Sequence, residues 1–272
     1  METAWISDYL KSNGNELFFT RTGGNKPPIV LAHGFTDDGS CWTDVAMALQ
    51  NDYDLVMYDA IGHGQSSRIA EDTSLDMVAD MHNIIIGLDL KKPAIIGHSM
   101  GAATAAGYAA IYPENVSAII LEDVPWFNEM RAPRKEEKTP FSEVIADLQK
   151  GPLKDAIAYS KLNNCHFADS VHEPWASSKL KFDLALFNRK WPKKTRWQEI
   201  AGKIACPTLL LTGDIEKGAL VTPKLAIEAL RLMPDLQWAH IPGAGHCIRY
   251  ERFSTTINVI KTYLKMKYPS KK

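Results

Sequence analysis

A serine between two glycines is the residue of this chain best placed to do chemistry. It is Ser99, in the pentapeptide 97–101, which reads GHSMG and has the form G-x-S-x-G. An apolar run at Ala94–Ile96 precedes the pentapeptide and small residues at Ala102–Ala110 follow it, so we expect a strand, a sharp turn and a helix. Such a turn lifts the serine hydroxyl clear of the backbone, where it can attack a carbonyl carbon.

The candidate base is His246. A serine hydroxyl is a weak nucleophile at neutral pH and needs a neighbouring base. His246 ends the glycine-containing loop Pro242–His246, directly after the predicted strand Leu236–Ile241. Because functional loops of a parallel sheet collect at the carboxyl ends of its strands, we expect Ser99 and His246 to meet there. The histidines to which we assign no chemistry are His33, His63, His82, His98, His166, His172 and His240.

Two backbone amides are candidates for binding the negative oxygen of a tetrahedral intermediate. Such an oxyanion needs hydrogen-bond donors that are already in place. One is the N–H of Met100, directly after the nucleophile. The other is the N–H of Phe35, in the His33–Thr36 loop after the predicted strand Ile29–Ala32.

Strands and helices alternate in two stretches of the chain, 1–124 and 201–272. The first stretch opens with a predicted hairpin, Trp5–Leu10 and Glu16–Thr20. The further predicted strands are Ile29–Ala32, Asp54–Tyr58, Ala94–Ile96, Ser117–Leu121, Thr208–Leu211 and Leu236–Ile241, and the predicted helices are Trp42–Leu49, Leu75–Leu88, Met100–Tyr112, Pro223–Leu232 and Phe253–Lys265. Short apolar strands that alternate with helices indicate an α/β core with a parallel sheet covered on both faces.

The segment 125–200 breaks this alternation. It contains a charge run at residues 131–138, many aromatic residues, and weak helical periodicity at Phe141–Leu148 and Leu153–Leu162. We interpret it as a helical cap inserted into the α/β core. Trp126 and Phe127, at the start of the cap, are candidates for lining an apolar pocket for a small-molecule substrate.

Composition argues against several other classes of protein. The 272 residues are 45% hydrophobic and 23% charged with a formal net charge of −1, so nothing predicts binding to nucleic acid or to a membrane. No apolar run has the length of a bilayer span, and the first residues do not predict a signal peptide. The four cysteines show no C-x-x-C spacing, which is typical of reduced thiols in a cytoplasmic protein. We also expect no metal and no cofactor, since the sequence contains neither metal-ligand spacing nor a G-x-G-x-x-G loop. The sequence does not predict the oligomeric state.

Four segments together resemble the motifs of the α/β hydrolases. They are Leu31–Phe35 (LAHGF), Tyr58–Gly64 (YDAIGHG), residues 97–101 and Gly243–His246 (GAGH), and the resemblance extends along nearly the whole chain. It implies an eight-stranded, mostly parallel sheet with flanking helices, a helical cap after the sixth strand, and a Ser–acid–His triad that works without a cofactor. The nearest resemblance is to the N-formylmaleamate deformylase-like and carboxylesterase-like branch.

The acid of the triad has three candidates. In many members of the family it follows the seventh strand, where Glu216 would fill the role and Asp214 stands nearby. In a minority, including the deformylase-like branch, it follows the sixth strand, where this chain has Asp123. The stretch between Glu216 and Val221 is longer than the usual pattern. We therefore favour Asp123, with Glu216 as the alternative and Asp214 third.

The predicted reaction is hydrolysis of a small carboxylic ester through an acyl-enzyme. The same triad serves hydrolysis of a small amide, a formamide, a lactone or a C–C bond, and cofactor-free perhydrolysis, so these reactions stay open. Serine rather than aspartate at the turn argues against haloalkane dehalogenases and epoxide hydrolases, which resemble this fold. A ligand-binding protein with an idle triad is the other class of function, and turnover by the purified protein separates the two.

Overall fold

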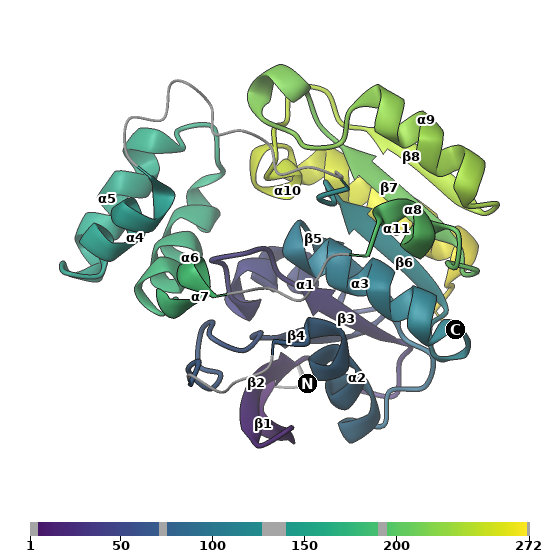
Figure 1. Ribbon diagram of the computed structural model, residues 1–272, viewed down its shortest axis with the longest axis horizontal. Coiled ribbons are helices and arrows are strands. Elements are labelled where there is room, and N and C mark those ends of the chain that lie inside the picture. Colours follow the sequence, from purple (N-terminus) through teal and green to yellow (C-terminus); the bar gives the residue numbers. More distant parts are fainter. Residues whose placement is uncertain (1–4, 71–74, 127–139, 190–194, 271–272) are drawn as a thin grey trace.

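One eight-stranded sheet organises the described part of the chain. The computed structural model describes residues 5–70, 75–126, 140–189 and 195–270. Within them the strand order is β1-β2-β4-β3-β5-β6-β7-β8, and β2 is the strand that runs antiparallel to its neighbours (Figure 1). The sheet confirms the predicted eight-stranded, mostly parallel architecture.

The central strands are buried from end to end. The strands are β1 (Ile6–Ser12), β2 (Asn15–Arg21), β3 (Pro28–Ala32), β4 (Asp54–Tyr58), β5 (Ala94–His98), β6 (Ala118–Glu122), β7 (Thr208–Thr212) and β8 (Leu236–His240). Every residue of β4, β5, β6 and β7 is buried. Because both faces of a parallel sheet are covered by helices, these strands are continuous apolar runs rather than alternating patterns.

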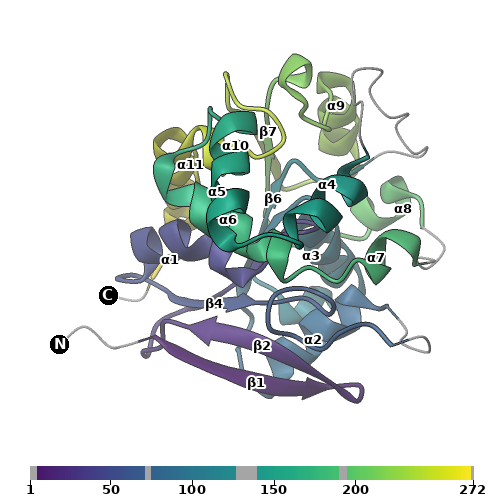
Figure 2. The same ribbon diagram turned by 90° about the vertical axis from the view of Figure 1, so that its left-hand side faces the viewer.

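Helices cover both faces of the sheet. On one face lie α1 (Thr43–Leu49), α10 (Ile248–Glu251) and α11 (Phe253–Lys267), and on the other lie α2 (Met77–Gly87), α3 (Met100–Ile111), α8 (Trp197–Ala201) and α9 (Pro223–Leu232). Figure 2 shows the two layers with the sheet between them. The two layers enclose two separate apolar clusters, one for each face of the sheet.

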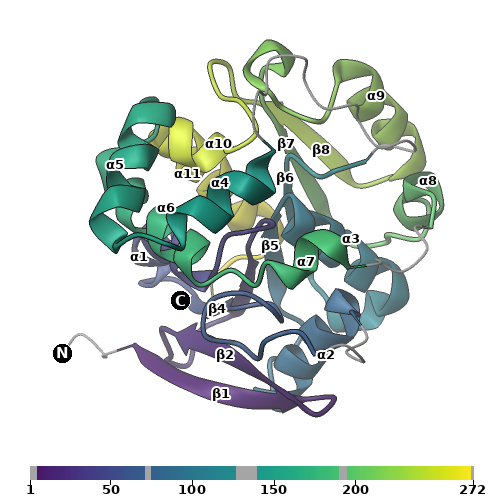
Figure 3. The same cartoon turned by 60° about the vertical axis from the view of Figure 1, so that its left-hand side comes forward.

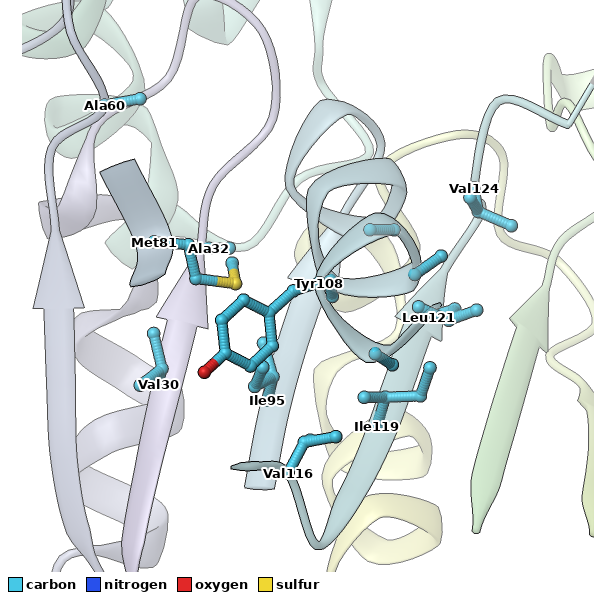
Figure 4. Packing of buried hydrophobic residues seen from close by; sticks show 14 of the residues in the cluster. Val30, Ala32, Ala60, Met81, Ile95, Tyr108, Val116, Ile119, Leu121 and Val124 are labelled. Carbon is cyan, nitrogen blue, oxygen red and sulfur yellow. The ribbon is translucent and has the colours of Figure 1, made fainter. Parts of the chain in front are cut away.

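Helix α3 lies close against the centre of the sheet because its inward face is made of small residues. Its buried alanines are Ala102, Ala105, Ala106 and Ala109. Figure 4 shows this layer, in which Tyr108 of the helix and Val30, Ile95 and Ile119 of the strands belong to one buried cluster. Each large apolar side chain buried there contributes about 1.5–3 kcal/mol. This packing fixes the start of α3, and with it Ser99, relative to the ends of the strands.

Four further helices form a group between β6 and β7 in the sequence. They are α4 (Phe141–Leu148), α5 (Leu153–Asn163), α6 (Asp169–Leu180) and α7 (Ala185–Asn188), and they lie together beside the sheet (Figures 1 and 3). The group contacts loops that follow strands: the Asp183 N–H donates to Gly62 O after β4 at 2.8 Å. The predicted end of the cap at residue 200 falls inside α8, which packs against α3 and α9.

Asp80, on α2, makes the stability of the fold depend on pH. The residue is 6% exposed, and Ser12 Oγ donates to its Oδ1 at 2.8 Å. Burial, together with repulsion from Asp76, raises the pKa of Asp80 to about 6. Since this pKa lies above the unfolded value of about 3.9, the stability that the protonated carboxyl contributes is fully present below about pH 4 and is lost as the pH rises through about 6.

We expect Asp80→Asn to remove this loss. The amide oxygen can still accept from Ser12, and the amide does not ionise. The difference in free energy of unfolding, variant minus wild type, should therefore increase by about 2–3 kcal/mol from pH 4 to pH 8. Denaturant unfolding of both proteins across that range measures the difference. A difference that does not change with pH would contradict the assignment.

Candidate active site

Ser99 sits at the sharp turn between β5 and α3. Its backbone lies at φ 51° and ψ −114°, a strained conformation for a residue with a side chain. A methyl group on Gly97 would lie 2.3 Å from Gly101 O, and one on Gly101 would lie 2.1 Å from Ala32 O. Both glycines are therefore required by backbone crowding, as the G-x-S-x-G pattern predicts.

We expect Gly101→Ala to be among the most damaging small substitutions. The added methyl group must displace the backbone of Ala32 and His33, which begins the predicted oxyanion loop. Overpacking of this kind costs about 1–3 kcal/mol or more, and the displaced loop should lower hydrolysis as well. Thermal unfolding measures the first effect, and the rate of the predicted ester hydrolysis measures the second.

Gly107→Ala is the matched control on the same helix. Its methyl group would meet only the end of the Val78 side chain, at 3.0 Å. Alanine also favours a helix over glycine by up to about 1 kcal/mol, so the control should stay close to wild type. Equal losses in the two variants would contradict the crowding argument.

His246 joins Ser99 to Asp123. Its Nε2 lies 3.1 Å from Ser99 Oγ and its Nδ1 lies 2.6 Å from Asp123 Oδ2. The His246 side chain is 32% exposed, whereas that of Asp123 is fully buried. In this arrangement Nδ1–H donates to the carboxylate, which leaves Nε2 to accept the serine proton.

Asp123 is held by the loop that follows β7. The N–H of Leu220 donates to its Oδ2 at 2.8 Å, and the N–H of Val221 donates to its Oδ1 at 3.1 Å. Asp123 itself has a positive φ of 44°, which turns the chain sharply at the end of β6. Backbone donors therefore fix the carboxylate while one oxygen faces His246.

The two other candidate acids do not contact His246. Asp214 Oδ1 lies 3.0 Å from His240 Nε2, and its Oδ2 accepts the Gly243 N–H at 2.8 Å. Glu216 is exposed in the same loop. His240, for which the sequence offered no partner, thus pairs with Asp214 at the edge of the sheet.

The loop after β3 lies directly beside Ser99. A methyl group on Gly34 would be 3.5 Å from Ser99 Cβ. His33 orders this loop: its Nε2 accepts the Ala60 N–H at 2.9 Å, and its Nδ1 donates to Gly34 O at 2.8 Å. Met100 begins α3, where an N–H has no acceptor within the helix. Both segments named for the oxyanion hole are therefore beside Ser99, while the donation of their amides to a substrate stays a prediction.

The histidines around the triad are buried and neutral. Burial lowers the pKa of His98, with Arg249 and His246 adding to the effect, and burial likewise lowers the pKa of His63. His98 Nε2 lies 3.0 Å from the carbonyl oxygen of His246, so it donates to the main chain of the predicted base.

Aromatic side chains of the cap segment meet the loop after β3. The Phe35 ring packs edge-on against Phe182 at 5.1 Å and Phe187 at 5.4 Å between centroids. Trp126 is 3% exposed and stacks on Trp197 at 5.0 Å, so the structure gives it a packing partner and its contact with a substrate stays a prediction. Phe127 lies outside the described residues.

A group of buried charged residues close to Ser99, His246 and Asp123 was not predicted from the sequence. They are Asp37, Glu122, Lys179 and Arg249. Burial raises the pKa of Glu122; burial also acts to raise that of Asp37, but Lys179 and Arg249 outweigh it and hold the pKa of Asp37 below its usual range. The available signals were a glutamate at the end of an apolar strand and an arginine three residues after His246.

Two other kinds of feature are absent from the described residues. No three or more His, Cys, Asp or Glu side chains among them are grouped so as to hold a metal ion. None of their helices combines the length and the apolar character needed to cross a bilayer.

Known proteins resemble this chain in sequence and in structure. N-formylmaleamic acid deformylase from Pseudomonas putida S16 superposes with a TM-score of 0.79 at 20% identity, over 94% of this chain and 100% of that one. An esterase from Exiguobacterium antarcticum superposes with a TM-score of 0.72 at 18% identity, over 96% and 100%. A serine hydrolase-like protein of Danio rerio is 30% identical over 140 residues, which are 50% of this chain and 40% of that protein, so the chain spans less than half of that relative's length. The model of the α/β hydrolase fold family matches residues 27–253, and the chain therefore belongs to this family.

Proposed function

We propose that this chain is a serine hydrolase that cleaves a small carboxylic ester through an acyl-enzyme. The observation that carries the proposal is the continuous contact from Ser99 Oγ through His246 to Asp123, at 3.1 and 2.6 Å. A strained serine at a strand-to-helix turn supports it. Membership of the α/β hydrolase family and the esterases among the structural neighbours support hydrolysis as the type of reaction.

Each residue then has one task in the reaction. His246 Nε2 removes the proton of Ser99 as its Oγ attacks the carbonyl carbon, and the Phe35 and Met100 amides stabilise the oxyanion. The protonated His246 gives that proton to the leaving alcohol, and an acyl-enzyme remains. Water, deprotonated by His246, attacks the acyl-enzyme. The C–O bond to Ser99 breaks, the protonated His246 returns a proton to Ser99 Oγ, and the acid leaves. Asp123 holds the imidazole in the required tautomer and stabilises its charged form.

Hydrolysis of a small formamide or amide is the second candidate function. Its support is the similarity to N-formylmaleamic acid deformylase, which has a TM-score of 0.79 over 94% of this chain. The same triad serves both reactions, and they differ in the leaving group that His246 must protonate.

Pre-steady-state kinetics of the purified protein test the proposal. With p-nitrophenyl acetate we expect a burst of p-nitrophenol equal to one per chain, followed by slower turnover. A fluorophosphonate should label Ser99, as read by mass spectrometry of the peptide. The corresponding p-nitroanilide and formanilide then compare amide with ester cleavage. Neither burst nor label in the folded protein would contradict the serine hydrolase.

A further inference from the structure

Arg249 is a buried cation three residues after His246, with its side chain 2% exposed. Its backbone N–H donates to Glu122 Oε1 at 2.8 Å, and its Nη1 donates to Glu122 Oε2 at 2.8 Å. Its guanidinium lies over the Trp42 ring, 3.8 Å from the centroid. Because two separate groups hold the two carboxylate oxygens, Glu122 cannot rotate without losing a charge-assisted hydrogen bond.

Glu122 contacts the nucleophile and precedes the acid. It is the last residue of β6, and Asp123 follows it in the chain. Its carbonyl oxygen accepts the Ser99 N–H at 2.9 Å. A shift of Glu122 would therefore move Ser99 and Asp123 relative to His246. Arg249 lies on α10, which begins two residues after His246.

Arg249 also reaches the loop that contains Phe35. Its Nη2 donates to the Tyr250 hydroxyl at 3.1 Å, and that hydroxyl donates to Asp37 Oδ2 at 3.0 Å. The Nη2 itself lies 4.0 Å from the same carboxylate oxygen. The Asp37 N–H donates to Gly34 O at 3.1 Å, which closes the turn around Phe35. One guanidinium on α10 thus connects the residues that end β6 with the loop after β3, and α10 begins two residues after His246.

We propose that Arg249 is a positioning residue, which sets the distances between Ser99, His246 and the predicted oxyanion amides by joining Glu122 to Asp37. The inference rests on the proposed function and goes beyond the triad itself. A simple role in charge neutralisation would need only a cation beside Glu122. The planar fork, the backbone donor on the same residue and the link through Tyr250 instead fix direction as well as charge.

Three variants separate positioning from charge neutralisation. Arg249→Met leaves Glu122 without its partner cation. The double variant Glu122→Gln/Arg249→Met removes both charges, and the new side-chain amide oxygen can still accept the backbone N–H of residue 249. Arg249→Lys keeps the charge but not the fork. The matched control is Arg21→Met, which removes the arginine that pairs with the buried Asp54. In wild type Arg21 Nη2 lies 2.6 Å from the Asp54 carboxylate, and this pair is at the ends of the strands that lie opposite to Ser99.

The expected result is a loss of kcat with little change in KM. We expect Arg249→Met and the double variant to lose about 10²-fold in kcat for a p-nitrophenyl ester, as a misplacement of about 1 Å would cause. Folded Arg249→Lys should lose about tenfold in kcat. Folded Arg21→Met should keep the wild-type kcat. Recovery of the wild-type kcat in the double variant would mean that Arg249 only neutralises Glu122, and would overturn the proposal. A wild-type kcat in Arg249→Lys would overturn it too, including when Arg249→Met fails to fold.

A proton resonance gives a readout that does not need turnover. The proton between His246 Nδ1 and Asp123 should give a signal far downfield in the proton NMR spectrum. We expect it in wild type and Arg21→Met, and expect it shifted or exchange-broadened in the Arg249 variants. A wild type that shows neither burst nor fluorophosphonate label contradicts the proposed function. An unchanged resonance in the folded double variant contradicts the positioning role alone.

Discussion

Replacement of Ser99 by alanine is expected to lower kcat for a p-nitrophenyl ester by about 10⁶-fold, to the limit of detection. In the proposed reaction the Ser99 Oγ forms the acyl-enzyme, and this oxygen lies 3.1 Å from His246 Nε2. Alanine fits the strained backbone as well as serine does, because both carry one Cβ. The variant should therefore fold like wild type, and its burst of p-nitrophenol should vanish.

The control for this variant is a serine of similar chemistry far from the site. Ser117 Oγ donates to Lys92 O at 2.7 Å, in an exposed setting before β6. Ser117→Ala should change kcat by less than about twofold, as for most surface substitutions. Ser99→Ala/His246→Ala should be no slower than Ser99→Ala, since the two residues act as one unit. A Ser99→Ala enzyme that keeps a substantial part of the wild-type rate would remove Ser99 from the mechanism.

The sheet and the turn at Ser99 could be predicted because local rules and the fold agree there. The strands from β4 to β7 are mainly apolar and completely buried, and β3 is buried except at Pro28. The glycines beside Ser99 are explained by contacts of less than 2.5 Å that any side chain would make with backbone. Where a conformation permits almost no residue other than glycine, that conformation can be predicted directly from the sequence.

The segment 125–200, predicted as a cap, was harder to predict in its second half. The predicted helix Phe141–Leu148 has the bounds of α4, whereas α6 has little periodicity. Helix α6 (Asp169–Leu180) was not predicted: it contains Pro174, and both His172 and Lys179 are buried on it. Lys179 is buried because it donates to Thr36 O at 3.1 Å and to Asp37 at 2.6 Å. A polar residue that is buried by a partner far along the chain looks like an exposed residue in the sequence.

The acid posed the same difficulty on a smaller scale. Asp123, Asp214 and Glu216 all follow strands, so their positions in the sequence do not separate them. What distinguishes Asp123 is that the amides of Leu220 and Val221 donate hydrogen bonds to its carboxylate. These two residues lie in a loop nearly a hundred residues later in the chain. Only the three-dimensional path of that loop decides which carboxylate faces His246.

Asp123→Asn is therefore expected to lower kcat by about 10⁴-fold. If the amide oxygen of the asparagine takes the place of Oδ1, which accepts from Leu220 at 3.0 Å and from Val221 at 3.1 Å, its NH₂ group faces His246 Nδ1. The imidazole must then carry its proton on Nε2, the tautomer that cannot accept from Ser99. If the amide flips instead, its NH₂ group faces two N–H donors and both interactions are lost. The kcat of Asp123→Asn should recover partly at high pH only if hydroxide takes the role of the base that His246 no longer provides.

Glu216→Gln is the matched variant, because it makes the same chemical change in the alternative acid. Glu216 is exposed, so we expect kcat within about twofold of wild type. Asp214→Asn should lower stability through its contacts with His240 and Gly243, while kcat of the folded enzyme stays near wild type. The comparison is made on one ester, at one pH, with folding checked for each variant. A large loss of kcat in Glu216→Gln, together with a nearly wild-type kcat in Asp123→Asn, would assign the role of the acid to Glu216 in the loop after β7. The 2.6 Å contact between Asp123 and His246 would then serve structure alone.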